Sequence, residues 1–472
     1  MKLTCLTDKV TYKMENKKQI ILKYNRPGPR YTSYPPANFF KSEFNNNNFI
    51  TQIEESNNVG QKNISIYIHI PFCSQRCHFC GCNTTLFENE TLVSKYIARL
   101  IKEIRTVVKY INTKDREVSQ IHWGGGTPNS IQHKHIERVM NELKTLFKIK
   151  KNAEIAIECN PAYIDFNQIL FLRKMGFNRI SIGIQDFNTK ILDCVNRLHS
   201  KLPHNELIKM VREAGFTGVN YDFIYGLPGQ TVESFNETIK KAIELSPDRL
   251  VTFSYAHVPW IMKHQKNLEK IGLPSPEEKL SMLLSSMEII VNSGYKQIGL
   301  DHYAKPTDEL SKALFNKKLH RNFQGYCTKE TTGQVFGFGC SSISQLWGGF
   351  SQNEKSLIKY IERIENEELA VERGYSLSFN EQVCKEVIDE IMCNGVLNFD
   401  EVGNIFSISA IKVKEIICYN NEKFKEFVDD ELLEITNNKL IVSKSGMLVV
   451  RNIAMALDPQ LNTEGNKYSK TI

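Results

Sequence analysis

The sequence predicts an α/β protein: a partial (β/α)6 TIM-like barrel of parallel strands, with an N-terminal arm and a small, mostly helical C-terminal domain. Three observations lead to this prediction. From residue 63 onward, six short β-rich runs alternate with amphipathic helical stretches, which is the pattern of βαβ units in a parallel sheet. Residues 1–62 lack this alternation, and from about residue 375 the pattern changes again.

Residues 1–62 are expected to form an irregular, polar arm over the active site. Prolines at positions 27, 29, 35 and 36 interrupt any regular element there. The asparagine run at 45–48 has the composition of a locally disordered segment.

Residues 63–374 are expected to form the barrel and its extension. Functional groups in such barrels lie where strands end and loops begin, so we expect the active site there. The strands are predicted at 64–70, 119–125, 153–159, 179–185, 219–226 and 249–258, and the helices at 92–108, 133–147, 166–175, 207–214 and 231–245.

Residues 375–472 are expected to form the C-terminal domain. Residues 381–392 have helical periodicity, and two apolar runs at 432–435 and 440–442 flank Asn437 and Asn438. An asparagine pair between two such runs indicates a hairpin turn.

Composition excludes several classes of protein. The chain has 472 residues and a formal charge of +7, but it lacks the concentrated basic stripe of a nucleic-acid binder. It contains no apolar run of the ~18 residues needed to span a membrane. The N-terminus has no signal-peptide core, so we expect a cytoplasmic protein.

Four of the 12 cysteines lie within ten residues, Cys73 to Cys82, directly after the first predicted strand. Clustered thiols in a reducing compartment suggest a metal site before a disulfide. Cys73, Cys77 and Cys80 have C-x3-C-x2-C spacing, and three thiolates on one loop leave one metal corner open. This spacing favours a [4Fe–4S] cluster, and Cys82 lies too close to Cys80 to complete the same site.

A closed zinc site is the alternative, with Cys82 or His78 as the fourth ligand. Spacing alone does not exclude it, nor an incidental clustering of thiols.

Other polar or glycine residues stand at strand ends or inside apolar runs. The triplet Gly124–Gly126 allows a ligand to approach the backbone, although a tight turn would also use it. Glu158 could bind a ligand or be a solvated strand-end carboxylate. Asp222 lies in an apolar run, where a charge is costly unless it is paired or faces a ligand, and the planar fork of Arg197 suits a carboxylate.

The cysteine motif, CSQRCHFC, resembles that of radical S-adenosylmethionine enzymes. The whole chain resembles the oxygen-independent coproporphyrinogen III oxidases (dehydrogenases) of that superfamily. The matching segments are PRYTSYPPA (29–37), YIHIPFC (67–73), CHFCGCN (77–83), HWGGGTP (122–128), SIGIQDFN (181–188), DFIYGLPGQT (222–231), LDHYAKPTDEL (300–310), LHRNFQGY (319–326) and RNIAMALD (451–458).

The resemblance implies a [4Fe–4S] cluster on three cysteine ligands, whose fourth iron is open to S-adenosylmethionine, and two bound molecules of S-adenosylmethionine. It implies that Tyr67, Gly125, Glu158 and Ile343 contact the first molecule. The residues implied for the second molecule are Phe79, Gly126, Thr127, Gln185, Arg197, Asp222 and Ala256.

The resemblance also implies catalytic roles outside the cofactor sites. Cys82 would lie near the second cofactor, although a buried inert thiol is the alternative. The arm residues Arg30 and Tyr31 would help to bind substrate, and Arg30 would meet a propionate through charge-assisted hydrogen bonds.

The implied activity is anaerobic oxidative decarboxylation of two propionates of coproporphyrinogen III to vinyl groups, giving protoporphyrinogen IX in haem biosynthesis. The expected partners are the substrate and an electron donor such as flavodoxin or ferredoxin, and the chain is expected to act as a monomer. The alternatives are a haem-binding chaperone and an anaerobic haem-degrading radical methyltransferase. Chaperones of this kind lack the arm and the HRNFQGY segment, and the methyltransferases lack the CGC ending at 80–82, whereas this chain has all three.

Overall fold

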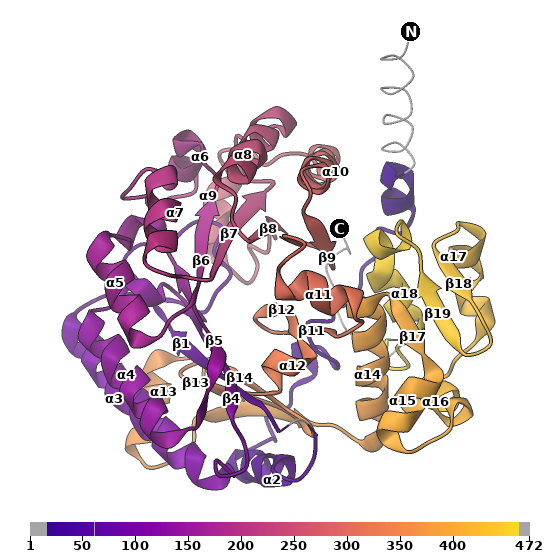
Figure 1. Cartoon of the computed structure of the whole chain (residues 1–472), viewed down its shortest axis with the longest axis horizontal. Helices are drawn as coiled ribbons and strands as arrows, with labels where there is room; N and C mark the ends of the chain where they lie inside the picture. Colours follow the sequence, from indigo (N-terminus) through magenta and orange to yellow (C-terminus); the bar gives the residue numbers. More distant parts are fainter. Residues whose placement is uncertain (1–16, 61, 462–472) are drawn as a thin grey trace.

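A computed structural model describes residues 17–60 and 62–461, and a 12-stranded sheet forms its centre, in the order β16-β15-β14-β13-β1-β4-β5-β6-β7-β8-β10-β9 (Figure 1). Six consecutive strands of this sheet pair in parallel, which confirms the predicted barrel strands. They are β1 (Ile64–Ile70), β4 (Val118–Gly125), β5 (Ile149–Cys159), β6 (Arg179–Gln185), β7 (Gly218–Tyr225) and β8 (Arg249–Ser254).

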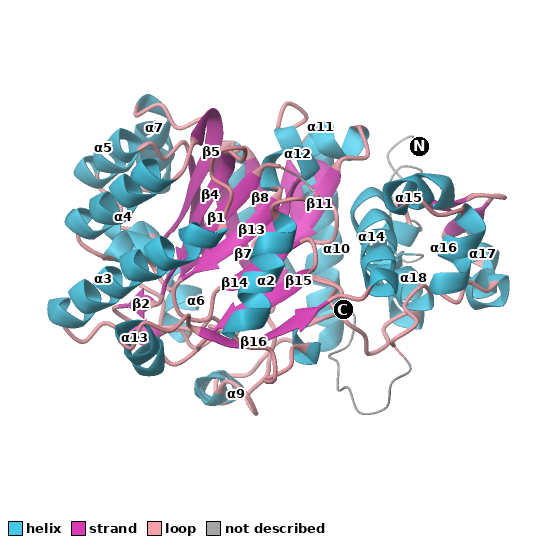
Figure 2. Ribbon diagram, turned by 90° about the horizontal axis from the view of Figure 1, so that it is seen from below, coloured by secondary structure: helices cyan, strands magenta, loops and turns pink. Residues whose placement is uncertain are grey.

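Helices cover the outer face of these strands (Figures 1 and 2). Asn89, Asp165 and Thr231 each stand at a helix N-cap, where the side chain accepts a hydrogen bond from a backbone N–H of the first turn. The helices are α3 (Glu90–Val107), α4 (His133–Leu146), α5 (Phe166–Met175), α6 (Thr189–Cys194), α7 (His204–Glu213), α8 (Val232–Leu245), α9 (Lys266–Glu269), α10 (Pro276–Asn292) and α13 (Leu357–Glu365).

The sheet extends beyond the six predicted strands on both sides. Strand β13 adds in parallel to β1, and the strands after it are antiparallel, as are the two beyond β8. These strands are β13 (Gln334–Phe338), β14 (Ile343–Leu346), β15 (Gly349–Asn353), β16 (Val371–Ser376), β9 (Lys296–Ile298) and β10 (His302–Ala304), and a short parallel pair, β2 (Phe72–Cys73) and β3 (Thr85–Leu86), holds the cysteine loop.

The arm is more regular than its composition predicts. Residues 17–23 are helical, and the asparagine run begins helix α2 (Asn46–Ser56) instead of being disordered. The side chain of Asn45 accepts hydrogen bonds from the N–H groups of Asn47 and Asn48, so the run supplies an N-cap. Burial of Phe49 and Ile53 then stabilises the helix against the sheet.

The C-terminal region has its own hydrophobic core, and the predicted hairpin pairs as expected. Tyr24, Tyr31 and Tyr34 of the arm belong to this core, so the first part of the arm packs on the C-terminal region. The elements are α14 (Phe379–Asn394), α15 (Phe399–Phe406), α16 (Ala410–Ile416), α17 (Lys425–Asp429), α18 (Val450–Ala456), β17 (Val396–Asn398), β18 (Leu433–Ile435) and β19 (Lys439–Val442).

Between the barrel and the C-terminal region lies a hairpin flanked by two helices (Figure 1). The hairpin strands are β11 (Leu319–Asn322) and β12 (Gly325–Thr328), and the helices are α11 (Glu309–Phe315) and α12 (Lys329–Thr332).

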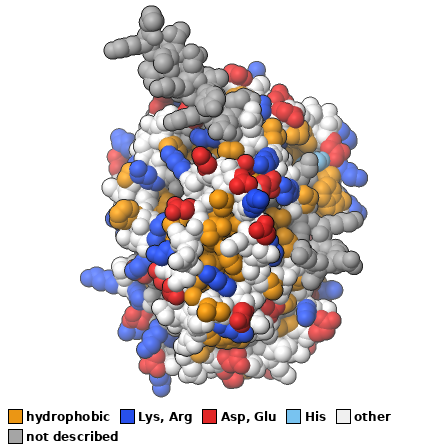
Figure 3. All heavy atoms as spheres, turned by 90° about the vertical axis from the view of Figure 1, so that its right-hand side faces the viewer, with side chains coloured by type: hydrophobic (Ala, Val, Ile, Leu, Met, Phe, Trp, Pro, Cys, Tyr) orange, Lys and Arg blue, Asp and Glu red, His pale blue; other side chains and the backbone are white. Residues whose placement is uncertain are grey.

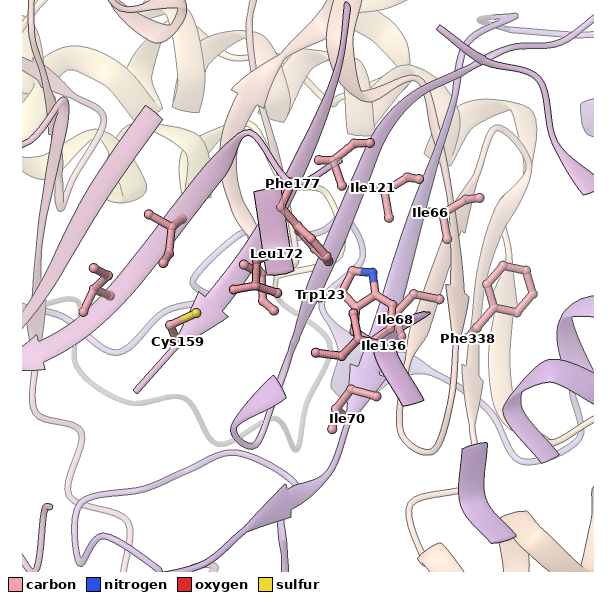
Figure 4. Close-up of a cluster of buried hydrophobic side chains, with 14 of the residues drawn as sticks. Ile66, Ile68, Ile70, Ile121, Trp123, Ile136, Cys159, Leu172, Phe177 and Phe338 are labelled. Carbon is pink, nitrogen blue, oxygen red and sulfur yellow. The ribbon is translucent and has the colours of Figure 1, made fainter. Parts of the chain in front are cut away.

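The barrel strands separate apolar from polar side chains by their period of two. On β1 and β4, Ile66, Ile68, Ile121 and Trp123 are buried among side chains of the covering helices, such as Ile136 (Figure 4). The alternate positions of β4 to β7 are mostly polar and line an internal cavity. The sequence therefore places its polar residues inside the barrel.

Within the described ranges 17–60 and 62–461, no helix is long and apolar enough to cross a membrane. Figure 3 shows the face formed by the C-terminal region, where Lys and Arg side chains are interspersed with Asp and Glu around exposed apolar side chains.

Candidate active site

A cavity of about 580 Å³ occupies the barrel interior and opens among the loops that follow its strands. Fourteen of the predicted site residues line it, namely Arg30, Cys73, Cys77, Phe79, Cys80, Cys82, Gly125, Gly126, Thr127, Glu158, Gln185, Arg197, Asp222 and Ala256. The fold thus brings together residues that are spread over more than 200 positions of the chain.

The cysteine loop is held from several sides. The N–H of His78 donates to the carbonyl of Val195 (2.9 Å). The amide of Gln265 donates to the carbonyl of Phe79 (3.1 Å), and the Nε2 of His264 lies 2.8 Å from the carbonyl oxygen of Cys80. These contacts fix the loop backbone and so hold the cysteine side chains at the cavity wall.

The four thiols have different surroundings. The Sγ of Cys73 lies 3.3 Å from the hydroxyl of Thr127, and Arg197 donates to the Sγ of Cys77 at 3.7 Å. Burial raises the pKa of both thiols. A side-chain hydrogen bond between Cys82 and Cys80 lowers the pKa of Cys80 and raises the pKa of Cys82. The thiolate of Cys80 is thus favoured over that of Cys82.

The donor set fits an iron–sulfur cluster better than a single ion. In the described residues, no group of three or more His, Cys, Asp or Glu side chains is arranged to hold one metal ion. A structural zinc site needs four ligands at about 2.0–2.3 Å from one atom. A cluster instead gives each thiolate its own iron, which suits three cysteines spread along one loop.

The glycine segment supports the beginning of this loop. The N–H of Gly126 donates to the carbonyl of Ile70 (2.7 Å), and that of Thr127 donates to the carbonyl of Phe72 (2.9 Å). A Cβ atom on Gly126 would lie 2.7 Å from the carbonyl oxygen of Phe72, and Gly125 has a φ of +115°. A side chain at either position would displace or strain the support of the cysteine loop.

Glu158 ends β5 as a hydrogen-bonded carboxylate that lines the cavity, with 42% of its side chain exposed. Its Oε1 lies 2.9 Å from the Nε2 of His122, and its Oε2 accepts from the N–H of Gly125 (3.3 Å). Burial raises the pKa of Glu158, but the hydrogen bond and charge of His122 outweigh burial, so the pKa lies below its ordinary value. Glu158 therefore offers the cavity a negative charge at neutral pH.

A second polar region lies around Arg197 and Asp222. Arg197 donates to the carbonyl of Gly183 (2.6 Å), while its buried Nε has no hydrogen-bond partner among the described residues. Burial raises the pKa of Asp222 to about 6, although Ser181 donates a hydrogen bond to it (2.7 Å). A polar ligand would satisfy both groups.

Three predicted site residues do not line the cavity. Tyr67 is half-buried, with its hydroxyl 3.1 Å from the Nδ1 of His69 and its ring stacked on that of His122, a lining residue. Tyr31 donates to the carboxylate of Asp458 (2.9 Å) in the C-terminal region, and Ile343 packs in a small apolar cluster. The described contacts of Tyr31 are structural, so they do not support its predicted contact with substrate.

The sequence analysis missed a set of ion pairs inside the barrel, which we call the polar floor. Arg179 donates to Glu154 (2.7 Å), and Arg249 donates to Asp308 (3.0 Å) and Glu309 (2.8 Å). A usable signal was present, because charged residues alternate with isoleucines in the strand runs that carry Glu154 and Arg179.

Comparison with known proteins gives consistent matches. Residues 67–242 match the model of the radical SAM superfamily. The chain is 38% identical to the oxygen-independent coproporphyrinogen III oxidase of Synechocystis, over 96% of this chain and 97% of that protein. It is 37% identical to the oxidase of Escherichia coli, over 96% of this chain and 98% of that protein.

The fold matches a solved structure equally well. The structure of coproporphyrinogen III oxidase from Escherichia coli, a radical SAM enzyme, superposes with a TM-score of 0.85 at 36% identity, covering 92% of this chain and 98% of that one. Sequence and fold agree over nearly the whole length, and the chain therefore belongs to the oxygen-independent coproporphyrinogen III oxidase family of radical SAM enzymes.

Proposed function

We propose that the chain catalyses the oxygen-independent oxidative decarboxylation of coproporphyrinogen III to protoporphyrinogen IX, a step of haem biosynthesis. The observation that carries the proposal is one cavity that joins three clustered cysteines to a cation, Arg30, in a chain of this family. The relatives reported above are named as this oxidase, so the haem chaperone and the haem-degrading methyltransferase are not favoured.

The cofactors are a [4Fe–4S] cluster and S-adenosylmethionine, which together supply a 5′-deoxyadenosyl radical when bound. Each conversion then removes one hydrogen atom from the β-carbon of a propionate, breaks its bond to the carboxylate and releases CO2. The one electron that remains at each propionate would pass to a separate one-electron acceptor, which leaves the vinyl group. A donor such as flavodoxin or ferredoxin would supply the electron that starts each turnover.

The residues of the chain bind and orient these groups. We assign Cys73, Cys77 and Cys80 to the cluster, because their thiols share one positioned loop that faces the cavity. Glu158 would attract the ammonium group of the first S-adenosylmethionine, because it is a carboxylate that lines the cavity beside the glycine segment. Arg197 would donate to a carboxylate of the second through its unpartnered Nε.

The proposed contacts form two sets. Those of the first S-adenosylmethionine are Tyr67, Gly125, Glu158 and Ile343, and those of the second are Phe79, Gly126, Thr127, Gln185, Arg197, Asp222 and Ala256. Nine of these eleven residues line the cavity. Tyr67 and Ile343 do not line it, and they would act through their neighbours.

Anaerobic reconstitution with iron and sulfide, followed by turnover with coproporphyrinogen III, tests the proposal. We expect vinyl products, and we expect Cys73→Ala, Cys77→Ala or Cys80→Ala to lose the cluster absorbance. Stable haem binding without turnover would contradict the proposed function. Full iron and sulfide content in the single variants would contradict the ligand assignment.

A further inference from the structure

Part of the cavity wall lies outside residues 67–242, the segment that matches the radical SAM model. Two chain segments that resemble this family, 300–310 and 319–326, contribute to this wall, and the functions proposed above use neither. The second of them forms the β11–β12 hairpin beside the barrel (Figure 1). The lining residues from these segments are His302, Asn322, Gln324, Gly325 and Tyr326.

His302 is the titratable group of this wall, and its ring is held on three sides. Its Nδ1 lies 2.6 Å from the Oδ1 of Asp301. Its ring packs edge-on against Tyr326, at 5.2 Å between centroids, and against Phe253, at 6.1 Å. A ring fixed by a carboxylate and two aromatic side chains has a defined orientation.

The remaining side of the ring, which carries Nε2, is left open. No hydrogen bond to Nε2 is present among the described residues, and His302 lines the cavity. Gly325 has a φ of +133°, and a Cβ atom there would lie only 3.2 Å from the Nε2 of His302. The glycine therefore leaves Nε2 accessible to a ligand.

Two arginine side chains, Arg321 and Arg30, lie near the partner of His302. Arg321 donates to the carbonyl of Arg30 (3.4 Å), and its buried Nε has no hydrogen-bond partner among the described residues. Burial raises the pKa of Asp301, but His302, Arg321 and Arg30 outweigh burial, so the pKa lies below its ordinary value. A carboxylate of a ligand on this wall would meet the same two arginines.

We propose that the Nε2–H of His302 donates a hydrogen bond to a propionate carboxylate of the substrate, with Asp301 as the positioning residue that orients the ring. In this contact the two ring nitrogens have separate partners, since Nδ1 faces Asp301 and Nε2 faces the ligand. Arg30, on the same wall, is placed to bind another carboxylate. This inference rests on the proposed function and names the wall that binds the carboxylates.

The test compares His302→Gln with His320→Gln in the reconstituted enzyme. His320 is a matched control, because its side chain is 14% exposed against 13% for His302 and also lies near an aspartate, Asp389. It does not line the cavity. The measurements are KM and kcat for coproporphyrinogen III, 5′-deoxyadenosine release without product, and anaerobic binding of coproporphyrin III by fluorescence.

We expect His302→Gln to raise KM and the coproporphyrin Kd by about tenfold, because the glutamine amide is a neutral donor and has no Nδ1–H through which Asp301 could orient it. Uncoupled 5′-deoxyadenosine release should continue, and His320→Gln should keep the wild-type KM. An unchanged KM in His302→Gln, or a fall in kcat alone, overturns the inference.

If His302→Gln does not fold or does not hold its cluster, the isosteric variant Asp301→Asn tests the inference instead. We expect a smaller rise in KM in this variant, and an unchanged KM overturns the inference. Failure of the wild-type enzyme to form vinyl products would instead refute the proposed function, so the two failures are distinguishable.

Discussion

Replacing Glu158 with Gln should weaken the binding of S-adenosylmethionine without removing the cluster. Glutamine has nearly the same size, so it keeps the shape of the cavity lining and can still contact His122 and Gly125, which now hold the carboxylate. What it loses is the negative charge that the ammonium group of the cofactor would meet. Cluster content should not change, because the three cysteine ligands lie on another loop.

The expected change in Kd follows from the energy of a hydrogen bond to a charged group. A hydrogen bond to a charged group contributes about 1.5–3 kcal/mol. Since 1.36 kcal/mol corresponds to a tenfold change in an equilibrium constant, the Kd of S-adenosylmethionine should rise about 10- to 150-fold.

The pH dependence has a definite sign. The pKa of Glu158 lies below its ordinary value, so the carboxylate is ionised throughout the neutral range and loses its charge only as the pH falls through that lowered pKa. The charge of Glu158 itself should therefore stay constant from about pH 8 to about pH 6, while its partner His122, whose pKa is raised, gains a proton as the pH falls and weakens the attraction for the ammonium group. In the variant the pKa of His122 should fall, because burial already lowers it and Glu158 now raises it.

The assay is anaerobic equilibrium dialysis of S-adenosylmethionine against reconstituted protein, with iron content measured in parallel. Glu154→Gln is the matched control, because Glu154 lies on the same strand and pairs with Arg179 in the barrel floor. A Kd for Glu158→Gln within twofold of wild type would refute the reasoning. Equal weakening in Glu154→Gln would show that the loss of affinity reports general damage to the barrel.

Three further predictions concern Cys82 and residues of the arm. Cys82→Ala should keep full iron content but lose much of the conversion of substrate; loss of the cluster would instead make Cys82 a ligand. Arg30→Ala should raise KM for coproporphyrinogen III about tenfold or more while 5′-deoxyadenosine release continues, and unchanged kinetics would remove Arg30 from substrate binding. Tyr31→Phe and Tyr34→Phe should each lower stability by about 1.5–3 kcal/mol where Asp458 is ionised, seen as a lower midpoint of urea unfolding. Loss of turnover with an unchanged unfolding midpoint would instead indicate that Tyr31 contacts the substrate.

The barrel was predictable because two strong periodicities agree. Isoleucines alternate with polar residues in the runs of β1 and β6, and amphipathic helices separate the runs at the spacing of βαβ units. The ends of parallel strands meet at one edge of a sheet, so the cysteine loop, Gly125 and Glu158 could be expected in one site. The structure brings them together around the cavity.

The remaining features depend on contacts between distant segments. Strands β9, β10 and β14 have three or four residues each, too few to establish a period, and their pairing is decided by the partner strand. Tyr31 joins a carboxylate 427 positions away, which no local pattern indicates. The polar floor was missed because Glu154 and Arg179 form an ion pair between two neighbouring strands, and the sequence of either strand alone does not show this contact.

The division of the cavity wall has a consequence for specificity. The proposed cluster ligands, Glu158 and Arg197 all lie within residues 67–242, the part that matches the radical SAM superfamily. Arg30 and His302 lie outside it and reach the cavity from the arm and from β10. The residues that generate the radical can serve many reactions, whereas the part of the cavity wall that lies outside residues 67–242 can differ with the substrate. Changes in the arm, in β10 or in the β11–β12 hairpin should therefore alter which carboxylates are accepted, and changes within 67–242 should alter the generation of the radical for any substrate.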